Sequence, residues 1–527
     1  MATAAPAKDI TVLRGNVPAV FQMNNLNSFN LSEVTITKLQ DHLGSKHFTS
    51  EQYVSLCLER IRQIDPYLEA VMEINPDALH IARNLDGERE RGVIRGPLHG
   101  IPVLVKDNIA TKDKMQTACG SWALLGSIVP RDAFVVSQLR KGGAIIIGHA
   151  NLTEWASLRS TWYSDGYSPR RGQVRNPYNL SCSPFGSSGG SAVAVSSNMV
   201  PLAFATETDG SIAGPAQING LVGIKPTPGL TSRKGVIPTS ESMDTVGLFG
   251  RTVADATIGL DTIVGPDPAD PLSVSDDVRR EAQGLASQYT DVGKYRIAPN
   301  GKWDWELGGP AQSEFTIIKT EAYNSLNSYL SELEKTDIKT FADIVRFNIK
   351  NSGTEGAVPG DHPAFPTGQD IFEKILAHKG TRDQDYYDAL EYTRKTTRAE
   401  GIDAALKHVT VDGKTVELDG LILCDRRLVG QQLAAQAGYP TVTLPIGVDE
   451  DGLPVGITIQ HKAWEEGTLI KWASAIEHLR DHTIGSRPLP AYHDHLAKNI
   501  PIGRKPAPGI YSESEVRWDP VAPGVSP

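Results

Sequence analysis

Apolar and polar residues recur along this chain at spacings that predict both helices and strands. The first clear pattern begins at Thr49-Ser50-Glu51-Gln52, which reads as the capping box of a helix. The apolar residues that follow fall on one stripe of that helix: Tyr53, Leu56, Cys57, Ile61 and Ile64. We interpret this element as a scaffold helix.

A strand, a helix and a second strand are predicted farther along the chain. Ile101 to Val105 is a short apolar run bounded by Gly and Pro, and Ala144 to Gly148 is a similar run. Between them, Ala133 to Lys141 reads as a helix that ends at Gly142-Gly143. The small apolar residues from Ala192 to Phe204 suit a helix packed against a strand. This alternation predicts an α/β sheet covered by helices on both faces.

The later part of the chain has a different pattern. From about Pro266 to Lys414 it is more polar and has helical spacing, most clearly in Phe315 to Leu333 and Asp385 to His408. The stretch from Ile500 to Pro527 is rich in Pro and Gly and has no periodicity. We expect that last stretch to form an extended or mobile arm.

Length and composition fit a large globular protein. The chain has 527 residues, 40% of them hydrophobic, which is ample for one large core, although length alone would predict two or three domains. Its 49 glycines indicate many tight turns. No apolar run approaches the roughly 18 residues of a membrane span, and Met1 to Ile10 lacks the apolar core of a signal peptide. The default expectation is a soluble, cytoplasmic protein without membrane contact.

Charge and cysteine content narrow the function classes. A net charge of −10 gives no basic surface for nucleic acid, which favours a small or peptide-like substrate. The cysteines fall at no metal-binding or redox spacing, so we expect them to be free and mostly structural: Cys57, Cys119, Cys182 and Cys424.

Two glycine-rich turns carry the candidate chemistry. Phe185 to Ser191 contains Ser187 and Ser188, and Thr206 to Ile212 contains Ser211. Serine becomes a good nucleophile only when a base takes its proton and backbone N–H groups await the oxyanion. Glycine allows such N–H groups to converge on one point. A histidine is the usual base for a serine hydrolase, but none lies in or near either turn.

Lys106 is the candidate base. It directly follows the apolar strand Ile101 to Val105, where full solvation of its side chain is not expected. Desolvation lowers the pKa of a lysine, by several units when burial is complete, so that a neutral amine could accept a proton at physiological pH. His99 lies near the same strand, but we interpret it as a structural hydrogen-bonding residue.

Two other readings of the serine turns are weaker. Gly186 to Gly190 fits the G-x-S-x-G nucleophile elbow with Ser188 at its centre, but that motif needs a preceding strand, and Asn179 to Pro184 reads as a loop. The same glycines lack the Gly-Lys-Ser/Thr end of a phosphate-binding loop. We therefore interpret Ser188 as a hydrogen-bonding neighbour of the site.

Together, Lys106 and the two serine turns resemble the amidase signature family of amide hydrolases. In that family a lysine, a bridging serine and a nucleophilic serine form the catalytic triad, and the interval from Ser187 to Ser211 equals the family's serine spacing. The resemblance runs from about Thr49 to His482. Further landmarks support it: Asn176-Pro177-Tyr178, Gly220 to Thr227, Ala437 to Pro440, Leu444-Pro445 and Gly452 to Gly456.

Within the family, the chain looks most like the peptide amidase branch. The segments that carry this likeness are Asn151 to Trp155 and Thr206 to Ser211. This chain has Glu207, Asp209 and Ala213 where the commoner family pattern has Asp, Gly and Arg, respectively. The version with Arg is typical of the A-type component of the aminoacyl-tRNA amidotransferase. Its absence argues against such a component.

The resemblance implies a single large domain with a central mixed β-sheet covered by helices on both faces. The domain would span residues 49–499, with a variable helical insertion at 266–414, an N-terminal arm at 1–48 and a tail at 500–527. The insertion could cover the mouth of the pocket, as in such enzymes, or form a solvated helical layer. A homo-oligomer is possible.

The resemblance also implies the chemistry. Lys106, Ser187 and Ser211 would form a Ser-cisSer-Lys triad that cleaves a carboxamide through an acyl-enzyme, releasing an acid and ammonia or an amine. The N–H groups of the second turn would form the oxyanion hole: Thr208, Asp209, Gly210 and Ser211. No metal or organic cofactor is expected.

The substrate is less defined by the sequence. The resemblance implies a peptide C-terminal amide or a small aryl or alkyl amide, with Met115, Cys119, Trp162 and Tyr163 as candidate pocket residues. Cys119 and Cys182, both near the site, could instead be small buried hydrophobes, and the aromatic residues could be surface packing groups. Carbamate, fatty amide or aryl acylamide hydrolysis uses the same triad, and a non-catalytic amide-binding relative is the alternative from another class.

Overall fold

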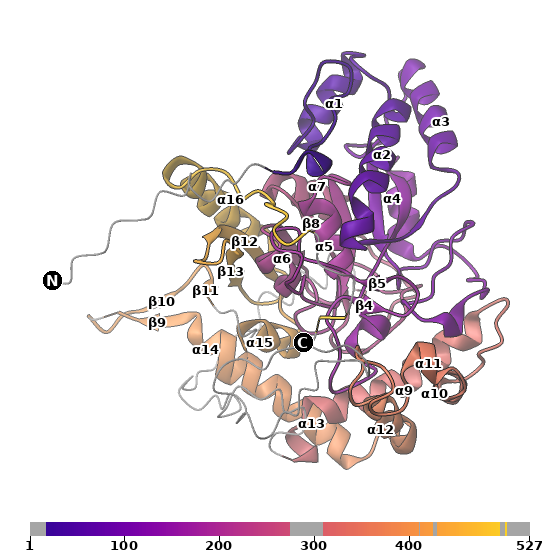
Figure 1. Ribbon diagram of the computed structural model, residues 1–527. Helices are drawn as coiled ribbons and strands as arrows, with labels where there is room; N and C mark the ends of the chain where they lie inside the picture. The colour runs from indigo at the N-terminus through magenta and orange to yellow at the C-terminus, as the bar shows by residue number, and fades with distance from the viewer. Residues whose placement is uncertain (1–16, 274–308, 411, 425–428, 496–500, 503–527) are drawn as a thin grey trace.

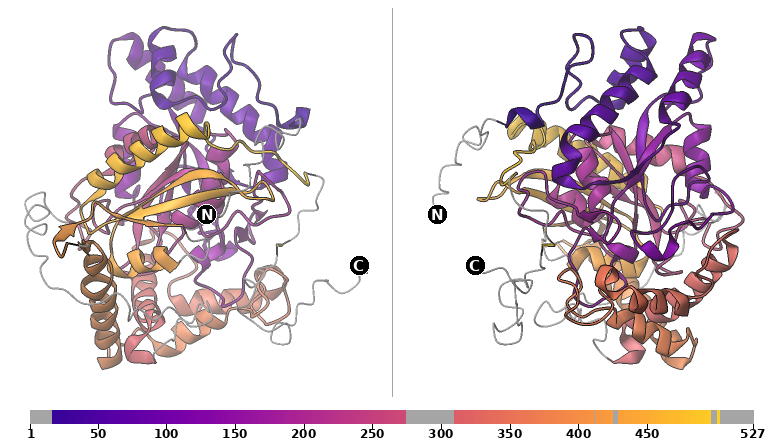
Figure 2. Two further views of the ribbon diagram at one scale, coloured as in Figure 1. Left: turned by 90° about the vertical axis from the view of Figure 1, so that its left-hand side faces the viewer. Right: turned by 45° about the vertical axis from the view of Figure 1, so that its right-hand side comes forward.

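A nine-stranded mixed sheet forms the centre of the molecule (Figures 1 and 2). The computed structural model describes residues 17–273, 309–410, 412–424, 429–495 and 501–502. Strand β2 pairs in parallel with β3 and β6, and the other neighbours are antiparallel. The strand order is β1 (Val71–Ile74), β3 (Ile145–Ala150), β2 (Pro102–Lys106), β6 (Leu202–Glu207), β8 (Thr245–Gly250), β7 (Val222–Lys225), β12 (Thr441–Val448), β13 (Pro454–Gln460) and β11 (Leu421–Leu423).

Two short hairpins lie outside this sheet, β4 (Tyr167–Ser168) with β5 (Gly172–Gln173) and β9 (Lys407–Val409) with β10 (Thr415–Glu417). The described helices are α1 (Ile36–Gly44), α2 (Ser50–Leu68), α3 (Ala78–Glu90), α4 (Phe134–Lys141), α5 (Gly189–Ser196), α6 (Ala213–Ile218), α7 (Val253–Ile263), α9 (Glu314–Glu332), α10 (Phe341–Lys350), α11 (Ser352–Glu355), α12 (Asp370–His378), α13 (Gln384–Arg394), α14 (Asp403–Ala405), α15 (Val429–Ala437) and α16 (Glu466–Thr483).

The elements predicted from the hydrophobic pattern before Glu207 are confirmed, and the ends of β2, β3 and α4 lie within two residues of the predicted bounds. Thr49 caps α2 through a capping box with Gln52, and all five residues of the predicted stripe are buried. Strands β2 and β3 and helix α4 occupy the three predicted positions. The small-residue run becomes α5 followed by β6. Strands β2, β3 and β6 are buried along their whole length, as expected for strands covered on both faces.

Helices cover both faces of the sheet. Two neighbouring residues of β8 show this. A Cβ atom built on Gly247 would clash with Ile212, just before α6, whereas the side chain of the next residue, Leu248, packs against Gly259 of α7. Successive residues of a strand point to opposite faces, so α6 and α7 lie on opposite sides of the sheet. The fold expected from the sequence, a large α/β domain with a helix-covered mixed sheet, is the fold observed.

The helices from α9 to α13, called the helical segment below, pack at one end of the molecule, opposite α1 to α3 (Figure 1). Its helices α9, α10, α12 and α13 contribute buried residues to the main core, among them Phe315, Phe341 and Phe372. One expectation here is wrong at its end. The helix predicted to continue to His408 becomes π-helical at Lys395–Ile402 and stops in α14, and β9 begins at Lys407.

The region predicted as an N-terminal arm contains an ordered helix. From residue 17 onward it packs on the main core, where Ile36, Leu39 and Leu43 of α1 are buried. Residues 1–16, and the part of the predicted tail from 503 onward, lie outside the described residues. The insertion predicted at 266–414 is described at 266–273 and from 309 onward, except residue 411.

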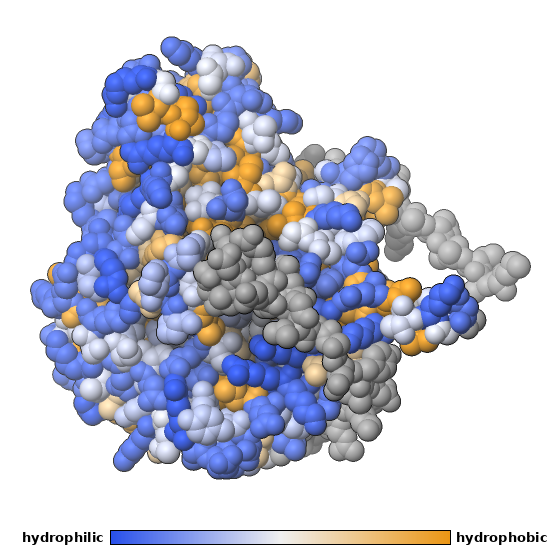
Figure 3. Space-filling view, turned by 180° about the vertical axis from the view of Figure 1, so that it is seen from behind, coloured by the Kyte–Doolittle hydropathy of each residue, from blue (hydrophilic) through white to orange (hydrophobic). Residues whose placement is uncertain are grey.

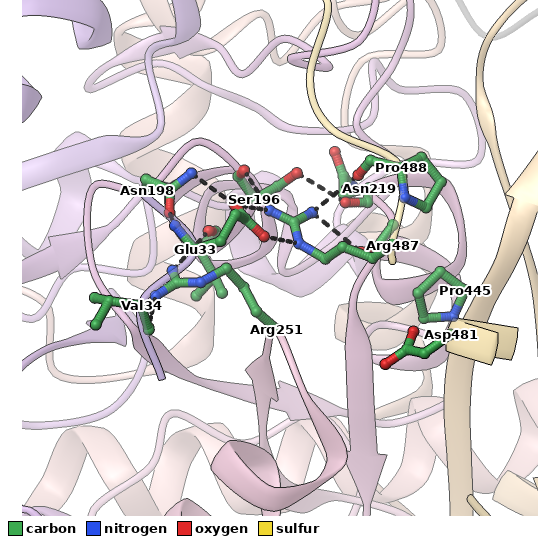
Figure 4. A network of polar contacts seen from close by, with 12 residues as sticks. Glu33, Val34, Ser196, Asn198, Asn219, Arg251, Pro445, Asp481, Arg487 and Pro488 are labelled. Carbon is green, nitrogen blue, oxygen red and sulfur yellow. Dashed lines mark hydrogen bonds and ion pairs between the residues drawn. The ribbon is translucent and has the colours of Figure 1, made fainter. Parts of the chain in front are cut away.

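A buried polar network ties the two ends of the described chain together (Figure 4). Arg487 forms a two-point ion pair with Glu33, with both N–O distances at 2.6 Å. The Arg487 guanidinium also donates to the carbonyl of Ser196 at the end of α5, and Asn198 donates to the Glu33 carboxylate. Arg251 donates to the carbonyl of Val34. Segments far apart in sequence therefore meet beside the helix that follows the first serine turn.

The surface seen in Figure 3 is largely polar, with apolar side chains in small groups. Within the described residues, none of the helices is both long and apolar enough to cross a bilayer.

Candidate active site

Lys106 ends β2 and lies in the interior, with no exposed side-chain surface. Its Nζ lies 2.7 Å from Ser187 Oγ and 2.9 Å from Ser188 Oγ. It also lies 2.9 Å from the hydroxyl and 3.2 Å from the carbonyl oxygen of Thr206. Burial lowers the pKa of Lys106 to about 7, although Cys119, Asp244 and Glu207 each act to raise it. A neutral amine with a lone pair is therefore accessible near neutral pH.

Ser187 connects this amine to the second serine turn. Its Oγ donates to Ser211 Oγ at 3.0 Å, which completes a hydrogen-bonded chain from Lys106 through Ser187 to Ser211. The peptide bond between Gly186 and Ser187 is cis. Lys106 and Ser187 are fully buried, whereas Ser211 is 9% exposed. Of the three groups, Ser211 is the one that a substrate can reach.

The turn that carries Ser211 joins β6 to α6. The Glu207 carboxylate accepts the N–H groups of Ile212, at 2.6 Å, and Ala213, at 2.8 Å, and so satisfies the start of α6. Gly210 adopts a positive φ of 104°, which suits glycine. Among the described residues, no acceptor is hydrogen bonded to the backbone N–H groups of residues 208–211. These four donors lie directly beside the Ser211 hydroxyl in the chain.

Asp209 places its side chain against the helical segment. Its carboxyl lies against that of Glu314, the first residue of α9. Burial and the nearby carboxyl groups of Glu314, Glu207 and Asp244 raise the pKa of Asp209 well above its usual value. The Asp209 side chain is thus held by a partner from a distant part of the chain.

Three further polar residues, Asp107, Asn108 and His149, surround the end of β2. The sequence patterns did not single them out. Asp107, next to Lys106, accepts the backbone N–H of Gly120 at 2.8 Å, and its other oxygen lies 3.0 Å from His149 Nδ1. Asn108 donates to the Thr206 hydroxyl at 3.0 Å. The only available signal was adjacency to Lys106 in sequence, because His149 comes from β3. We infer that these residues fix the loop around residue 120 relative to β2.

The candidate pocket residues fall into two groups. Met115 and Cys119 are buried, and Cys119 lies close enough to Lys106 for each to influence the other's pKa. Trp162 and Tyr163 are half-buried on a loop that contacts the helical segment, where the backbone N–H of Trp162 donates to Thr367 Oγ1 at 3.1 Å. The helical segment thus supports the loop that carries these aromatic side chains.

Three simpler expectations are confirmed, those on His99, on the residues before Ser187 and on free cysteines. His99 is structural, with Nε2 3.0 Å from the Leu85 carbonyl and Nδ1 accepting the Arg95 N–H. The residues before Ser187 form a loop rather than a strand, which removes the nucleophile-elbow reading. The cysteines are free. Across the residues that the structure describes, no group of three or more His, Cys, Asp or Glu side chains is arranged to hold a metal ion.

Comparisons with known proteins agree with this geometry. The amidase family profile matches residues 52–339. A Schizosaccharomyces pombe protein named as an amidase is 43% identical, over 92% of this chain and 91% of its own. A glutamyl-tRNA(Gln) amidotransferase component from Natranaerobius thermophilus is 29% identical, over 85% of this chain and 96% of its own. The crystal structure of native peptide amidase from Stenotrophomonas maltophilia superposes with a TM-score of 0.73 and 37% identity, over 87% of this chain and 99% of that chain.

Proposed function

Because this chain belongs to the amidase family, and is therefore an amide-hydrolysing enzyme, we propose that Ser211 is its nucleophile, Ser187 its proton relay and Lys106 its base. The observation that carries this assignment is the continuous hydrogen-bonded chain from Lys106 Nζ through Ser187 Oγ to Ser211 Oγ. It ends in an amine whose pKa is about 7. The base is thus poised near the operating pH, where proton transfer is most effective.

The acylation step follows from this chain. Lys106 Nζ takes the proton of Ser187 while Ser187 Oγ takes that of Ser211, and Ser211 Oγ forms a bond to the carbonyl carbon of the amide. Negative charge develops on the carbonyl oxygen. The N–H groups of residues 208–211, which lack acceptors in the described part of the protein, are positioned in sequence to receive it. One such donor is typically worth about 3 kcal/mol in the barrier.

Collapse of the tetrahedral intermediate completes acylation. The C–N bond breaks, and the proton held at Lys106 returns through Ser187 to the leaving nitrogen, which departs as ammonia or an amine. Water then attacks the Ser211 ester with the same relay as base, and the acid leaves as Ser211 regains its proton. Ser188, which donates to the Thr206 carbonyl at 3.0 Å, helps to hold Lys106 in position.

We propose a carboxamide substrate of the peptide-amide class. Two observations support it: the sequence of the Ser211 turn, which follows the peptide amidase pattern, and the overall likeness to the Stenotrophomonas maltophilia peptide amidase. The half-buried aromatic residues Trp162 and Tyr163 would contact the substrate beyond the reacting amide. Met115 and Cys119 would line the part of the pocket nearer Lys106.

A substrate panel tests this proposal. Purified wild-type protein and Ser211→Ala are incubated with peptide amides, anilides and carbamates while released ammonia or amine is measured. We expect wild type to release ammonia from peptide amides and Ser211→Ala to release none above background. Preference for anilides or carbamates would contradict the substrate class alone, whereas normal turnover by Ser211→Ala would contradict the nucleophile.

A further inference from the structure

The side chain of Asp209 poses a chemical problem beside the proposed oxyanion turn. The carboxyl groups of Asp209 and Glu314 lie against each other. Glu314 Oε2 accepts the side-chain amides of Gln432, at 2.6 Å, and Gln436, at 2.8 Å, both from α15. Glu314 Oε1 and Asp209 Oδ2 are buried, and neither receives a donor from the rest of the described protein.

A shared proton resolves this arrangement. Ionised carboxylates are acceptors only, so two of them cannot hydrogen bond unless one carries a proton. A single proton on Asp209 or Glu314 turns one of the two carboxyl groups into a donor for the other. Glu314 is only 5% exposed, so a second charge in this position would also lose most of its solvation. Burial acts to raise the pKa of both carboxyl groups. The negative charge of Glu314 also acts to raise the pKa of Asp209.

The other ionisable groups around the turn have their own donors. Glu207 on β6 is held by two backbone N–H groups, and Asp244, before β8, accepts Thr208 Oγ1–H and the N–H groups of residues 239 and 240. Burial raises the pKa of Asp244 despite these bonds. Glu207 also acts on two buried amines, Lys106 on β2 and Lys225 on β7, and burial lowers the pKa of Lys225 to about 8.

We propose that Asp209 and Glu314 share one proton and that this acid pair locks α9 and α15 against the oxyanion turn. Asp209 and Glu314 are then positioning residues, because they act on the reaction through the backbone of residues 208–211. This inference rests on the proposed function of Ser211. It gives the helical segment a role at the site, since a helix from that segment holds the turn that bears the nucleophile.

The acid pair predicts an alkaline limit to activity. Loss of the shared proton leaves two adjacent carboxylates that repel each other, which separates α9 from the turn and disturbs the oxyanion donors. Lys106 sets the opposite limb, because its amine must be neutral to accept a proton and activity rises as pH increases through about 7. The wild-type profile is therefore bell-shaped, with the acid limb from the lysine and the alkaline limb from the acid pair.

Amide substitutions separate the two limbs. Glu314→Gln supplies a fixed N–H donor in place of the shared proton, so we expect kcat at neutral pH within about threefold of wild type and no alkaline limb. Glu314→Ala removes the partner, and we expect a roughly tenfold to hundredfold lower kcat with little change in KM. Glu332→Gln, at the far end of the same helix and in surface ion pairs with Lys234 and Arg131, is the matched control.

Infrared spectroscopy provides a readout independent of turnover. Burial beside Glu154 raises the pKa of Glu355 to about 9, so a second protonated carboxyl is expected and the readout is a difference spectrum. We expect wild type minus Glu314→Gln, and wild type minus Asp209→Asn, to contain the deuterium-sensitive carbonyl stretch of a buried protonated carboxyl at neutral pH, and wild type minus Glu332→Gln to lack it. An alkaline limb absent from wild type or unchanged in Glu314→Gln, or the absence of this band from both amide-variant difference spectra, overturns the acid pair. Turnover by Ser211→Ala would instead overturn the proposed function, while the infrared band still reports on Asp209 and Glu314.

Discussion

At the scale of single residues, the environment of Lys106 decides the chemistry. Its nitrogen has four oxygen neighbours, two of them serine hydroxyls, and no exposed surface. A charged ammonium has three N–H donors for these four oxygens, whereas a neutral amine has two donors and a lone pair that can accept from a hydroxyl. The neutral form therefore matches the serine-rich surroundings and can act as a base.

Removal of this amine should abolish most activity without unfolding the protein. For Lys106→Ala we expect a fall in kcat/KM of about 10²- to 10⁴-fold at neutral pH, the usual contribution of general acid–base catalysis. Steady-state kinetics and thermal unfolding, measured on the same preparation, check this. Lys106 has a lowered pKa in the folded state, so burial of the charged amine costs the most stability below about pH 7. This cost shrinks as pH rises from about 7 towards the usual lysine value, because the unfolded chain binds more protons in that range.

The melting temperature of Lys106→Ala is the control for this result. Because the substitution removes a buried amine that is costly near neutral pH but also leaves a cavity and unpaired hydroxyls, we expect a cooperative transition within a few degrees of wild type. Near-wild-type activity in a folded variant would show that Lys106 is not the base.

The residues of the candidate site differ in how far the sequence could reveal them. Lys106, Ser187 and Ser211 could be identified because each lies in a local pattern, an apolar strand end or a glycine-rich turn. His149 and Glu314 could not. Each reaches the site through a contact with a residue far away in the chain, Asp107 and Asp209, and such pairings depend on how the strands and helices assemble.

At the scale of elements, local signals located the helices and strands that position the site. The apolar run ending at Lys106 predicted β2, and the small residues after Ser187 predicted α5. The change from α13 to π-helical geometry at Lys395–Ile402 and the start of β9 at Lys407 were not predicted, because helical periodicity continues through these residues. The pairing of β9 with β10 outweighs that local preference.

The capping box of α2 gives a prediction about stability at this scale. The Thr49 side chain accepts the Gln52 N–H at 3.1 Å, and the Gln52 side chain accepts the Thr49 N–H at 3.0 Å. Thr49→Ala removes the first of these bonds, so we expect a loss of about 1 kcal/mol in unfolding free energy with unchanged kcat/KM. Denaturant titration measures the first quantity.

Ser474→Ala serves as the comparison for the capping box. The Ser474 hydroxyl donates to the carbonyl of Ile470 in its own helix, α16, and is exposed, so we expect a change within about 0.5 kcal/mol. Equal effects of the two substitutions would indicate that the capping box contributes nothing specific.

At the scale of the whole molecule, the strand order could not be predicted from the sequence. Parallel pairing of β2 with β3 and β6 brings the end of the lysine strand beside Thr206, and antiparallel neighbours complete the sheet. Sequence patterns identify individual strands but do not specify which strands lie side by side. The family resemblance supplied the fold class, and the structure supplied the register that places the two serine turns around one amine.

The ion pair between Glu33 and Arg487 gives a prediction about the whole molecule. Burial acts to raise the pKa of Glu33, but the charges of Arg487 and Arg251 and the hydrogen bonds from Arg487 and Asn198 together lower it. A lowered folded-state pKa means that the pair stabilises the protein above the unfolded value of 4.5, and that this contribution is lost as pH falls below it.

For Glu33→Gln we therefore expect a loss of about 2 kcal/mol in unfolding free energy at neutral pH, since Arg487 remains buried without its charged partner. The difference from wild type should shrink as the pH is lowered below 4.5. Denaturant titrations over a pH series measure both effects. A difference independent of pH would show that the lost stability does not come from the charge of Glu33. Glu51→Gln, in an exposed pair with Arg83, is a matched control with little expected effect.

The assignment of Ser211 as nucleophile is tested most directly by mapping a covalent adduct. Wild type, Ser211→Ala and Ser187→Ala are treated with a fluorophosphonate probe, digested and analysed by mass spectrometry. We expect wild type to carry the adduct on the peptide containing Ser211, Ser211→Ala to carry none, and Ser187→Ala to label much more slowly at the same residue. An adduct on Ser187 or Ser188 in wild type, or undiminished labelling of Ser211→Ala, would contradict the account.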